Sequence, residues 1–562
     1  MTKCHCLAIA NLTCPTDIIV YADAPNYPSI KEGLDRLTDA DQIIMHNGMM
    51  FDFPAIEYLY PDVDIRREQI VDTLIYSRLQ HPQRGGHGLA KWGERLGFPK
   101  GDYSDWSTFT KEMGEYCATD VAVTIKVYDF LTTERKDADL LNSYNLERDF
   151  AYVMGIQERH GFKLDVPACE SLASEMRQKM ADIEVQLQEV FPPITVERVS
   201  EKTGKRLKDK IEIFNPGSRK QIAERLITMY EWTPNKFTPA GSPQIDETVL
   251  KQLKYPEAQL LAEYFLYQKQ LSQISEGASG WLKCVTDAGY VHGSVNPIGT
   301  TTNRCSHFGP NMAQISKRDL RMREVWKPDV GDKLVGIDAD ALELRMLAHY
   351  LGHFDDGAYT TALLEGKKED GTDVHSRTGK LIELDDRDVV KRATYAYLYG
   401  ASDRKLSQIM REANAPCKNG KEIRRRMNEG IIGLGKLSDL IKKRAERGYI
   451  LGIDGRHIKI LSPHSALNFL LQSAGSILMK KALVIFHYDL CERDGHVVEE
   501  LPITFNYCAN VHDEVQLSCR PQHAEAIGKL FAKAIKLAGE QLGLNCPTSG
   551  SYDIGNSWRE TH

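Results

Sequence analysis

Two short apolar segments, far apart in the sequence, each place a carboxylate at the end of a predicted strand. In KLVGIDADALELRMLAHYL, the run LVGI predicts a strand that ends at Asp338 and turns into a helix containing Glu343. In YCANVHDEVQLSC, Asp513 and Glu514 interrupt an alternating strand pattern. On neighbouring strands, Asp338 and Asp513 can hold two Mg²⁺ ions about 3.5–4 Å apart, as metal-dependent phosphate chemistry requires. Taken alone, each acidic residue is more often an ordinary turn or strand-end carboxylate.

A predicted helix in RDVVKRATYAYLYGAS has charged and aromatic residues spaced by four. Arg387, Lys391, Tyr395 and Tyr399 drift by about 40° per step at roughly 100° per residue, so they share one helix face. The two cations suit the phosphates of a nucleotide, and the two aromatic rings suit its sugar and base. His375 precedes this helix in DVHSRTG and can add a hydrogen-bond donor. The alternative is a solvated cationic face with the tyrosines in the core.

Length and composition are those of a multidomain globular chain. The 562 residues correspond to about three or four domains, and 42% hydrophobic with 27% charged residues is an ordinary mixture. The sequence has no apolar run of about 18 residues, so no membrane span is predicted. The N-terminus also lacks a signal-peptide pattern. Twelve scattered cysteines without a CxxC pair indicate reduced thiols rather than a zinc site.

The net charge of −7 is unevenly distributed. Residues 1–130 contain 12 Lys and Arg against 19 Asp and Glu, a net of −7, and the remainder contains 59 of each kind. This excludes a uniformly basic nucleic-acid binder. A binder with positive charge along one groove and carboxylates gathered at one catalytic spot remains compatible with these counts.

Five segments stand in the order used by the family A DNA polymerases. DADALELR resembles their motif A, RDVVKRATYAYLYG their motif B and VHDE their motif C. GIDGRHIKILSPHSALNFLLQSAG resembles the palm segment between motifs B and C, and TNRCSHFGPNMAQI resembles the minor-groove motif. Together these segments cover most of residues 290–520. The resemblance is closest to the replicative polymerases of T-seven-like bacteriophages.

The resemblance implies a role for each matching residue. Asp338 and Asp513 would ligate two Mg²⁺ ions, for which Mn²⁺ can substitute, with the Ala339 carbonyl as a further ligand. Glu343 would lie under the sugar and exclude a ribose 2′-hydroxyl, and Lys391 would donate a proton to the pyrophosphate leaving group. The other nucleotide-binding residues would be His375 and Arg387 at the triphosphate, Tyr395 at the sugar 3′ position and Tyr399 at the nascent base pair. The implied primer–template contacts, which check shape rather than sequence, are Arg304, Arg456, Asn468, Gln472 and His512.

The implied fold is α/β and multidomain: an RNase H-like 3′–5′ exonuclease-type domain followed by a right-hand polymerase. The expected boundaries are 1–135 for an incomplete exonuclease-like domain, 136–290 for the thumb region, 351–455 for the fingers, and 291–350 with 456–562 for the palm. Phage relatives have a long thumb insertion that recruits host thioredoxin. Here we expect only a short basic segment near 195–212, a solvated loop that could grip duplex phosphates, and no thioredoxin dependence.

The N-terminal region resembles a proofreading domain that lacks its first motif. HNGMMFDFPAI resembles the second exonuclease motif, with Asp52, and YCATDVAVT the third, with Tyr116 and Asp120; Asp72 also has a family-like position. These exonucleases need a further Asp-x-Glu on their first strand, but the first strand-like run here, CHCLAIANL, contains no carboxylate. We expect 3′–5′ exonuclease activity to be absent or very weak, through natural loss, deliberate truncation or a misplaced start codon. The alternative is a DNA polymerase with residual proofreading exonuclease.

Two positions depart from the family pattern. Asp340 stands where the family usually has a small hydroxyl residue. Its carboxylate could lie near the metals or point to solvent, and we expect the latter. Tyr395 stands where many members have phenylalanine, and in the family a tyrosine here goes with poor discrimination against dideoxynucleotides.

The expected reaction is attack of a primer 3′-hydroxyl on the α-phosphate of a dNTP, with pyrophosphate released. The setting would be phage genome replication in the cytoplasm of a bacterial host. Expected partners are primer–template DNA, dNTPs, a phage helicase-primase and a single-strand binding protein, with no membrane. A single-subunit RNA polymerase is opposed by Glu343 and the exonuclease-like region. A non-catalytic DNA-binding protein is opposed by the intact Asp338, Lys391 and Asp513.

Overall fold

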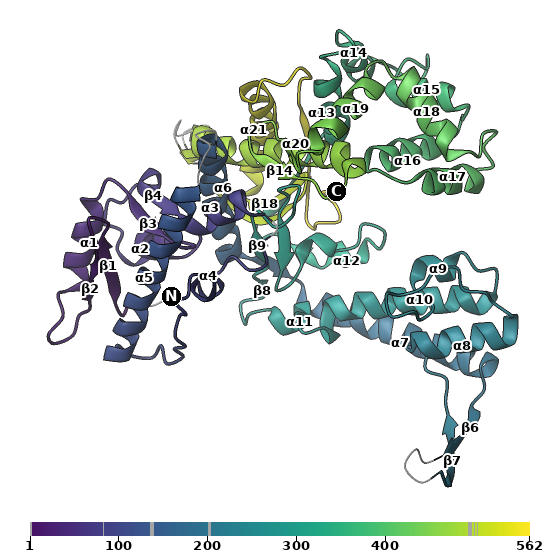
Figure 1. Ribbon diagram of the computed structural model, residues 1–562, viewed down its shortest axis with the longest axis horizontal. Helices are drawn as coiled ribbons and strands as arrows, with labels where there is room; N and C mark the ends of the chain where they lie inside the picture. Colours follow the sequence, from purple (N-terminus) through teal and green to yellow (C-terminus); the bar gives the residue numbers. More distant parts are fainter. Residues whose placement is uncertain are drawn as a thin grey trace. The chain divides into compact units, whose positions relative to one another are not determined.

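The computed structural model describes residues 3–82, 84–134, 140–199, 204–492, 497–498, 501–502 and 504–562. The chain divides into two compact units (Figure 1). Unit 1 consists of Met1–Gly161, Gly293–Ile315 and Pro328–His562, and unit 2 consists of Phe162–His292 and Ser316–Lys327.

A four-stranded antiparallel sheet forms the centre of the C-terminal part of unit 1. Its order is β17 (Phe505–Val511), β18 (Glu514–Cys519), β12 (Lys333–Ala339) and β19 (Gly550–Gly555). β12 is apolar over consecutive residues because it is an inner strand and is buried along most of its length. Its register pairs Asp338 with Glu514, so Asp338 lies beside the turn that joins β17 to β18. The pairing of two distant strands predicted from the sequence is therefore present.

Two long helices pack behind this sheet. α21 (Pro521–Gln541) contacts β12 and β19, and α20 (Ala466–Val484) packs against α21. The segment Pro463–Cys491 is long and apolar enough to cross a membrane by composition, but 78% of its apolar window is buried inside the protein. α20 is therefore accounted for as a core helix.

A group of helices follows β12 and shares one apolar core with the sheet (Figure 1). Asp373 and Asp386 cap two of these helices through their side chains, which accept backbone N–H groups of the first turn. The helices are α13 (Leu342–Leu351), α14 (Ala358–Leu364), α15 (Val374–Ile382), α16 (Arg387–Leu398), α17 (Asp403–Glu412), α18 (Gly420–Gly430) and α19 (Leu434–Ala445). Short strand pairs nearby are β9 (Ser294–Asn296) with β10 (Ser306–Phe308), β13 (Tyr449–Leu451) with β14 (His457–Lys459), and β15 (Val497–Val498) with β16 (Leu501–Pro502).

The N-terminal part of unit 1 has a second apolar core. Its strands form two separate pairs: β1 (Leu7–Asn11) with β2 (Cys14–Tyr21), antiparallel, and β3 (Ile43–Met45) with β4 (Ile70–Asp72), parallel. The helices are α1 (Ile30–Thr38), α2 (Asp52–Leu59), α3 (Thr73–Gln80), α4 (Leu89–Arg95), α5 (Lys111–Glu134) and α6 (Leu140–His160). α6 contributes side chains both to this core and to the core around the sheet.

Unit 2 is mainly helical. Phe162, Trp281 and Trp326 pack together beside a small sheet of β11 (Trp326–Lys327), β5 (Phe162–Leu164) and β8 (Tyr290–Val291). Its helices are α7 (Val166–Val190), α8 (Arg219–Tyr230), α9 (Glu247–Lys251), α10 (Pro256–Leu271), α11 (Trp281–Cys284) and α12 (Arg321–Glu324).

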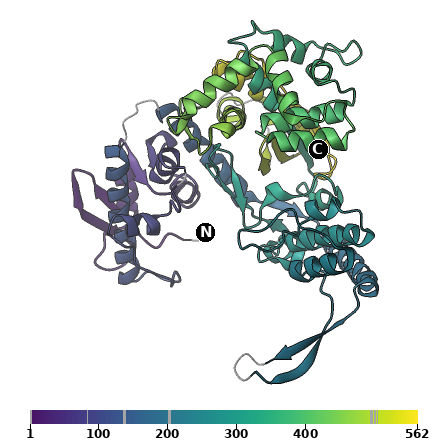
Figure 2. The ribbon, with the colours of Figure 1, turned by 45° about the vertical axis from the view of Figure 1, so that its right-hand side comes forward.

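The basic segment near 195–212 is not the solvated loop that we expected. β6 (Ile194–Val199) and β7 (Arg206–Glu212) form an antiparallel hairpin that projects from the helices of unit 2 (Figure 2). Leu207 and Ile211 are the two apolar residues of RLKDKIE and lie on one face of the strand, and Ile211 lies opposite Thr195. We expected a loop because five of the seven residues of β7 are charged.

Candidate active site

The two predicted carboxylates meet at one end of the four-stranded sheet. Asp338 lies near the end of β12, and His512 and Asp513 form the turn between β17 and β18. The Ala339 N–H donates to the Asp513 carbonyl at 3.2 Å, so Asp513 lies directly beside the residue that follows Asp338. His512 adopts the left-handed conformation (φ 60°) that this tight turn needs. Both aspartates are half-buried at the mouth of the sheet.

These residues offer oxygen donors to a metal. Among the residues that the structure describes, no group of three His, Cys, Asp or Glu side chains forms a metal cluster. Two carboxylates and a neighbouring carbonyl are nevertheless ligands that Mg²⁺ prefers, and Mg²⁺ usually retains water and substrate oxygens as its other ligands. The chemistry of Asp338, Ala339 and Asp513 therefore fits the predicted metal.

Asp340 takes a position that differs from our expectation of solvent. Ser549 Oγ donates to Asp340 Oδ2 at 2.6 Å, and Ser551 Oγ donates to Asp340 Oδ1 at 3.0 Å. The Asp340 N–H also donates to the Ser549 carbonyl at 3.0 Å. The carboxylate is thus engaged with the segment around the start of β19, and its partners lie more than two hundred residues away in the sequence.

Two predicted residues from separate segments, Arg304 and Tyr399, converge on the carboxylate of a third, Glu343. Glu343, in the first turn of α13, accepts hydrogen bonds from Arg304 at 3.2 Å and from the Tyr399 hydroxyl at 2.9 Å. Burial, followed by the charges of Glu343 and Asp513, raises the pKa of Tyr395. Tyr395 therefore lies close to both Glu343 and Asp513.

The tyrosines of α16 differ in their exposure. The tyrosine that packs into the core is Tyr397, which is 4% exposed, whereas Tyr399 is 44% exposed. The rings of Tyr395 and Tyr399 lie 6.1 Å apart. Tyr399 is therefore open to a ligand, whereas Tyr395, on the same helix face, is half-buried and packs against the core.

The cationic end of this face is organised by a carboxylate. Arg387 forms an ion pair with Asp373 at 2.7 Å, and Asp373 also accepts from the Ser376 hydroxyl. Burial raises the pKa of Asp373, but the hydrogen bonds from Ser376 and Arg387 outweigh it and lower the pKa to about 2. Burial, Arg387 and Lys391 together lower the pKa of His375. The three residues predicted to bind phosphates are therefore close neighbours.

Several predicted primer contacts border the same space. A small cavity of about 20 Å³ is lined by residues that include Arg304, Ser476, His512 and Asp513. Asn468 and Gln472 occupy α20 at spacings of four from Ser476, so the three residues share one helix face. The Asn468 Oδ1 atom is buried without a hydrogen-bond partner. Arg304, Gln472, Asn468 and His512 are thus compatible with one surface beside the carboxylates.

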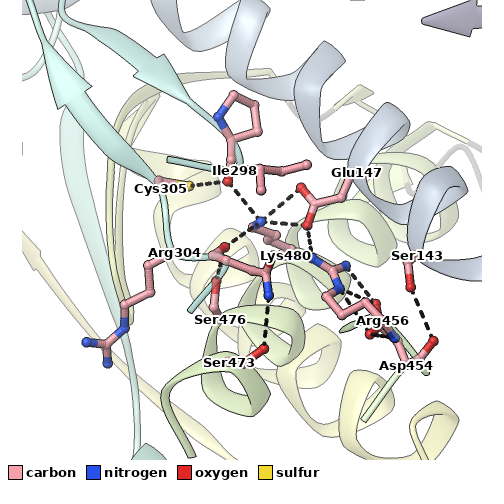
Figure 3. A network of polar contacts seen from close by, with 12 residues as sticks. Ser143, Glu147, Ile298, Arg304, Cys305, Asp454, Arg456, Ser473, Ser476 and Lys480 are labelled. Atoms are coloured by element: carbon pink, nitrogen blue, oxygen red, sulfur yellow. Dashed lines mark hydrogen bonds and ion pairs between the residues drawn. The ribbon is translucent and has the colours of Figure 1, made fainter. Parts of the chain in front are cut away.

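Arg456 does not fit the predicted contact with primer or template. Its side chain is 1% exposed, and its guanidinium contacts Glu147 at 2.5 Å and Asp454 at 2.6 Å (Figure 3). Both nitrogens that form these pairs face carboxylates of the protein interior, so in this structure the guanidinium is not available to DNA. The prediction failed because Glu147 lies 309 positions earlier in the chain.

The sequence analysis missed Glu147 and Lys480, which belong to the same network. Lys480 is buried and ion-paired with Glu147 at 2.7 Å. The available signal was a lysine within the long apolar segment LLQSAGSILMKKAL, because a buried lysine needs a charged partner.

The predicted exonuclease residues do come together, and a lysine lies against two of them, Tyr116 and Asp120. Lys100 pairs with Asp120 at 2.7 Å, and its ammonium lies 4.4 Å from the centre of the Tyr116 ring. Burial, followed by the charges of Asp72 and Asp120, raises the pKa of Asp52. Solvent in the adjoining cavity reaches Asp52 and screens part of that effect. The cavity has a volume of about 1290 Å³ and borders β1, β3, α2 and α5.

The Asp72 carboxylate holds the local backbone in place. Its carboxylate accepts backbone N–H groups of Asn47 at 3.0 Å, Met49 at 3.1 Å and Leu74 at 2.9 Å. Burial raises the pKa of Asp72, and these three hydrogen bonds counteract the rise. Asp72 therefore fixes the start of α3 and the loop after β3.

Carboxylates at the end of an antiparallel sheet, faced by a helix with cations and tyrosines, define a right-hand polymerase palm and its fingers. Residues 194–560 match the model of DNA polymerase family A. The chain belongs to this family and is a DNA-directed DNA polymerase.

Similar proteins agree with this assignment. The DNA-directed DNA polymerases of Enterobacteria phage T3 and Escherichia phage T7 are each 28% identical, over 100% of this chain and 98% of their own length. DNA polymerase I of Aquifex aeolicus is 26% identical over 94% of this chain and 89% of its own. The solved POL domain of Pol1 from M. smegmatis, in complex with DNA primer-template and dNTP, has a TM-score of 0.75 at 17% identity, over 97% of this chain and 92% of that one. The predicted right-hand fold class is confirmed.

Proposed function

We propose that the chain extends a primer by two-metal nucleotidyl transfer at the end of β12. The adjacency of Asp338 and Asp513 supports this most directly, through the pairing of Asp338 with Glu514 and the 3.2 Å contact between Ala339 and Asp513. Asp338, Asp513 and the Ala339 carbonyl would hold two Mg²⁺ ions, or Mn²⁺ in their place. Such ions activate the primer 3′-hydroxyl and stabilise charge on the reacting phosphate.

The side chains on α15 and α16 would bind the incoming dNTP. Arg387, Lys391 and His375 would hold the triphosphate and stabilise the negative charge that develops on it. As the 3′-oxygen forms its bond to the α-phosphate, the bond to the pyrophosphate oxygen breaks, and Lys391 donates a proton to that oxygen. The ion pair with Asp373 already orients the Arg387 guanidinium for this contact.

Selection for deoxyribose would come from Glu343. Hydrogen bonds from Arg304 and Tyr399 fix its carboxylate, so it cannot turn away from a nucleotide without breaking both. A ribose 2′-hydroxyl at this position would lie against Glu343, whose Oε1 atom already accepts hydrogen bonds from Arg304 and Tyr399. Tyr395 would lie at the sugar 3′ position.

The substrates would be primer–template DNA and dNTPs, as named for the M. smegmatis structure. Arg304, Asn468, Gln472 and His512 would contact the primer end and its minor groove. We propose a role in phage genome replication in the cytoplasm of a bacterial host, alongside a helicase-primase and a single-strand binding protein. The similarity to the T3 and T7 enzymes along the whole chain supports this setting.

We further propose that 3′–5′ exonuclease activity is absent or very weak. The ion pair between Lys100 and Asp120 supports this, because a metal at Asp120 would have to displace the ammonium.

The decisive experiment uses a 5′-labelled primer on a longer template with Mg²⁺, with and without dNTPs. The primer is expected to grow with dNTPs and to stay intact without them. Asp513→Asn should abolish growth, because one of the two metal-binding carboxylates is lost. A primer that shortens without dNTPs would show that Asp52 and Asp120 suffice for excision, and growth by Asp513→Asn would contradict the proposed mechanism.

A further inference from the structure

Four charged side chains form a buried network beside the active site (Figure 3). Glu147 of α6 is 0% exposed and Lys480 of α20 is 2% exposed. Lys480 Nζ lies 2.7 and 2.9 Å from the two carboxylate oxygens of Glu147. Arg456 joins Glu147 to Asp454, which completes a set of two cations and two anions. Buried ions of this kind are tolerated because their partners offset the loss of hydration.

Lys480 also closes a loop of the minor-groove motif. Its ammonium donates to the carbonyl of Pro297 at 2.9 Å and to that of Asn303 at 2.8 Å, near the two ends of the connection between β9 and β10. Asn303 adopts φ 61°, and its carbonyl also accepts from Ser476 Oγ at 2.9 Å. Two residues of α20 therefore hold the residue that immediately precedes Arg304 in the sequence.

Arg304 connects this loop to the active site. Its backbone N–H donates to Thr300 Oγ1 at 3.0 Å, and its guanidinium donates to Glu343 at 3.2 Å. Lys480, Arg304 and Asp513 line the same cavity of about 20 Å³, which is room for about one water molecule. A displacement of the Asn303 carbonyl would therefore also shift Arg304, the next residue in the chain.

We propose that Lys480 is a positioning residue for Arg304. By fixing the carbonyls of Pro297 and Asn303, it sets where the guanidinium meets the primer terminus, and it thereby favours extension of a correctly paired end. This inference rests on the proposed contact between Arg304 and the primer minor groove. A lysine that served stability alone would affect matched and mismatched primer ends equally.

The test compares Lys480→Met, Arg304→Ala and the double variant in the full chain. The measured quantity is kcat/KM for the next dNTP on a matched and on a 3′-mismatched primer, with active sites titrated so that unfolded protein is not counted. Lys480→Met is expected to lower kcat/KM on the matched end about tenfold, as when a hydrogen bond to a charged group is weakened. The mismatched end should change much less. In the Arg304→Ala background the match-to-mismatch ratio should not fall further, because both residues act through one contact.

Two further variants separate positioning from folding. The double variant Glu147→Gln/Lys480→Met removes one negative and one positive charge, so neither charge is left buried without the other. It tests the contacts of Lys480 with Pro297 and Asn303 if Lys480→Met alone does not fold. Asp454→Asn is the matched control, because it changes the same network through Arg456 while leaving Lys480 on Pro297 and Asn303. It should lower stability and preserve the ratio.

The outcomes distinguish the two proposals. Equal losses on matched and mismatched ends, or a further fall of the ratio in the double variant, would overturn the positioning role of Lys480. A ratio left unchanged by Arg304→Ala would instead overturn the proposed contact between Arg304 and the primer, and the inference for Lys480 with it.

Discussion

A single hydroxyl on α16 is expected to decide how the enzyme treats dideoxynucleotides. Tyr395 is close enough to Glu343 and Asp513 for both charges to raise its pKa, after the larger effect of burial. The ring therefore lies near the proposed sugar site at Glu343 and near Asp513. Its hydroxyl can supply a hydrogen bond to a bound nucleotide that lacks its own 3′-hydroxyl, and a phenylalanine cannot.

Tyr395→Phe is therefore expected to lower dideoxynucleotide incorporation relative to dNTPs by about 10- to 100-fold, the worth of a hydrogen bond to a charged group. The measurement is chain termination on a primed template at a fixed ratio of the two nucleotides. Tyr399→Phe is the matched control, since it removes a hydroxyl that contacts Glu343 and keeps Tyr395. Equal termination by the wild type and Tyr395→Phe would contradict the role of the hydroxyl.

His307 gives the fold a dependence on pH. Burial, followed by the charge of His512, lowers the pKa of His307 to about 4, below the roughly 6.5 of an unfolded histidine. Such a group stabilises the fold fully above about pH 6.5 and loses that contribution as the pH falls through the folded pKa. Between pH 7 and 5, the free energy of unfolding should fall by about 2 kcal/mol more in the wild type than in His307→Gln. Urea unfolding at both pH values tests this, and parallel profiles would refute it.

At the scale of elements, the β6–β7 hairpin is expected to make an electrostatic contact with duplex DNA. Lys205, Lys208 and Lys210 are exposed on or beside β7. Each phosphate that they neutralise should contribute about 0.9 to the slope of log affinity against log salt. Replacing all three with serine is expected to reduce this slope by up to about three, whereas Lys220→Ser on α8 serves as the control. Fluorescence anisotropy with a labelled duplex measures the slopes, and an unchanged slope would exclude the contact.

The β6–β7 hairpin is also expected to influence processivity. If its lysines bind the duplex directly, product length on a primed single-stranded template should be the same with and without thioredoxin. The triple serine variant should make shorter products under both conditions. Products that lengthen when thioredoxin is added would show that unit 2 recruits that protein.

Local patterns predicted the parts of the site that depend on neighbouring residues. The strand that ends at Asp338 and the spacing of four on α16 follow from period and sequence alone, and both are present. Distant side-chain partners outside the motifs were not predictable. Arg456 was assigned to DNA because nothing nearby reveals Glu147, and Asp340 was assigned to solvent because its serines belong to the segment around β19.

At the scale of the whole of unit 1, helix α6 joins the N-terminal domain to the polymerase sheet. Tyr144 stacks on Tyr76 with ring centres 4.0 Å apart, and its hydroxyl accepts the Asp72 N–H at 2.6 Å. One turn further along the helix, Glu147 enters the network with Lys480. The N-terminal domain therefore supports the helix that carries Glu147, the partner of Lys480, whatever its own activity.

A shortened chain that begins at Leu140 should therefore be less stable than the full chain, even if the exonuclease is inactive. Tyr144 and Ala151 would lose their contacts with the N-terminal core, and exposing one aromatic ring of about 150–250 Å² at ~25 cal/mol per Å² alone costs several kcal/mol. The midpoint of thermal unfolding of the polymerase part is expected to fall by about 5–10 °C. The full-length Asp52→Asn/Asp120→Asn variant, which removes two acidic groups and keeps the apolar core, should unfold within a few degrees of the wild type. Calorimetry of the three proteins tests this, and equal midpoints for the shortened and full chains would show that α6 holds the network without the N-terminal domain.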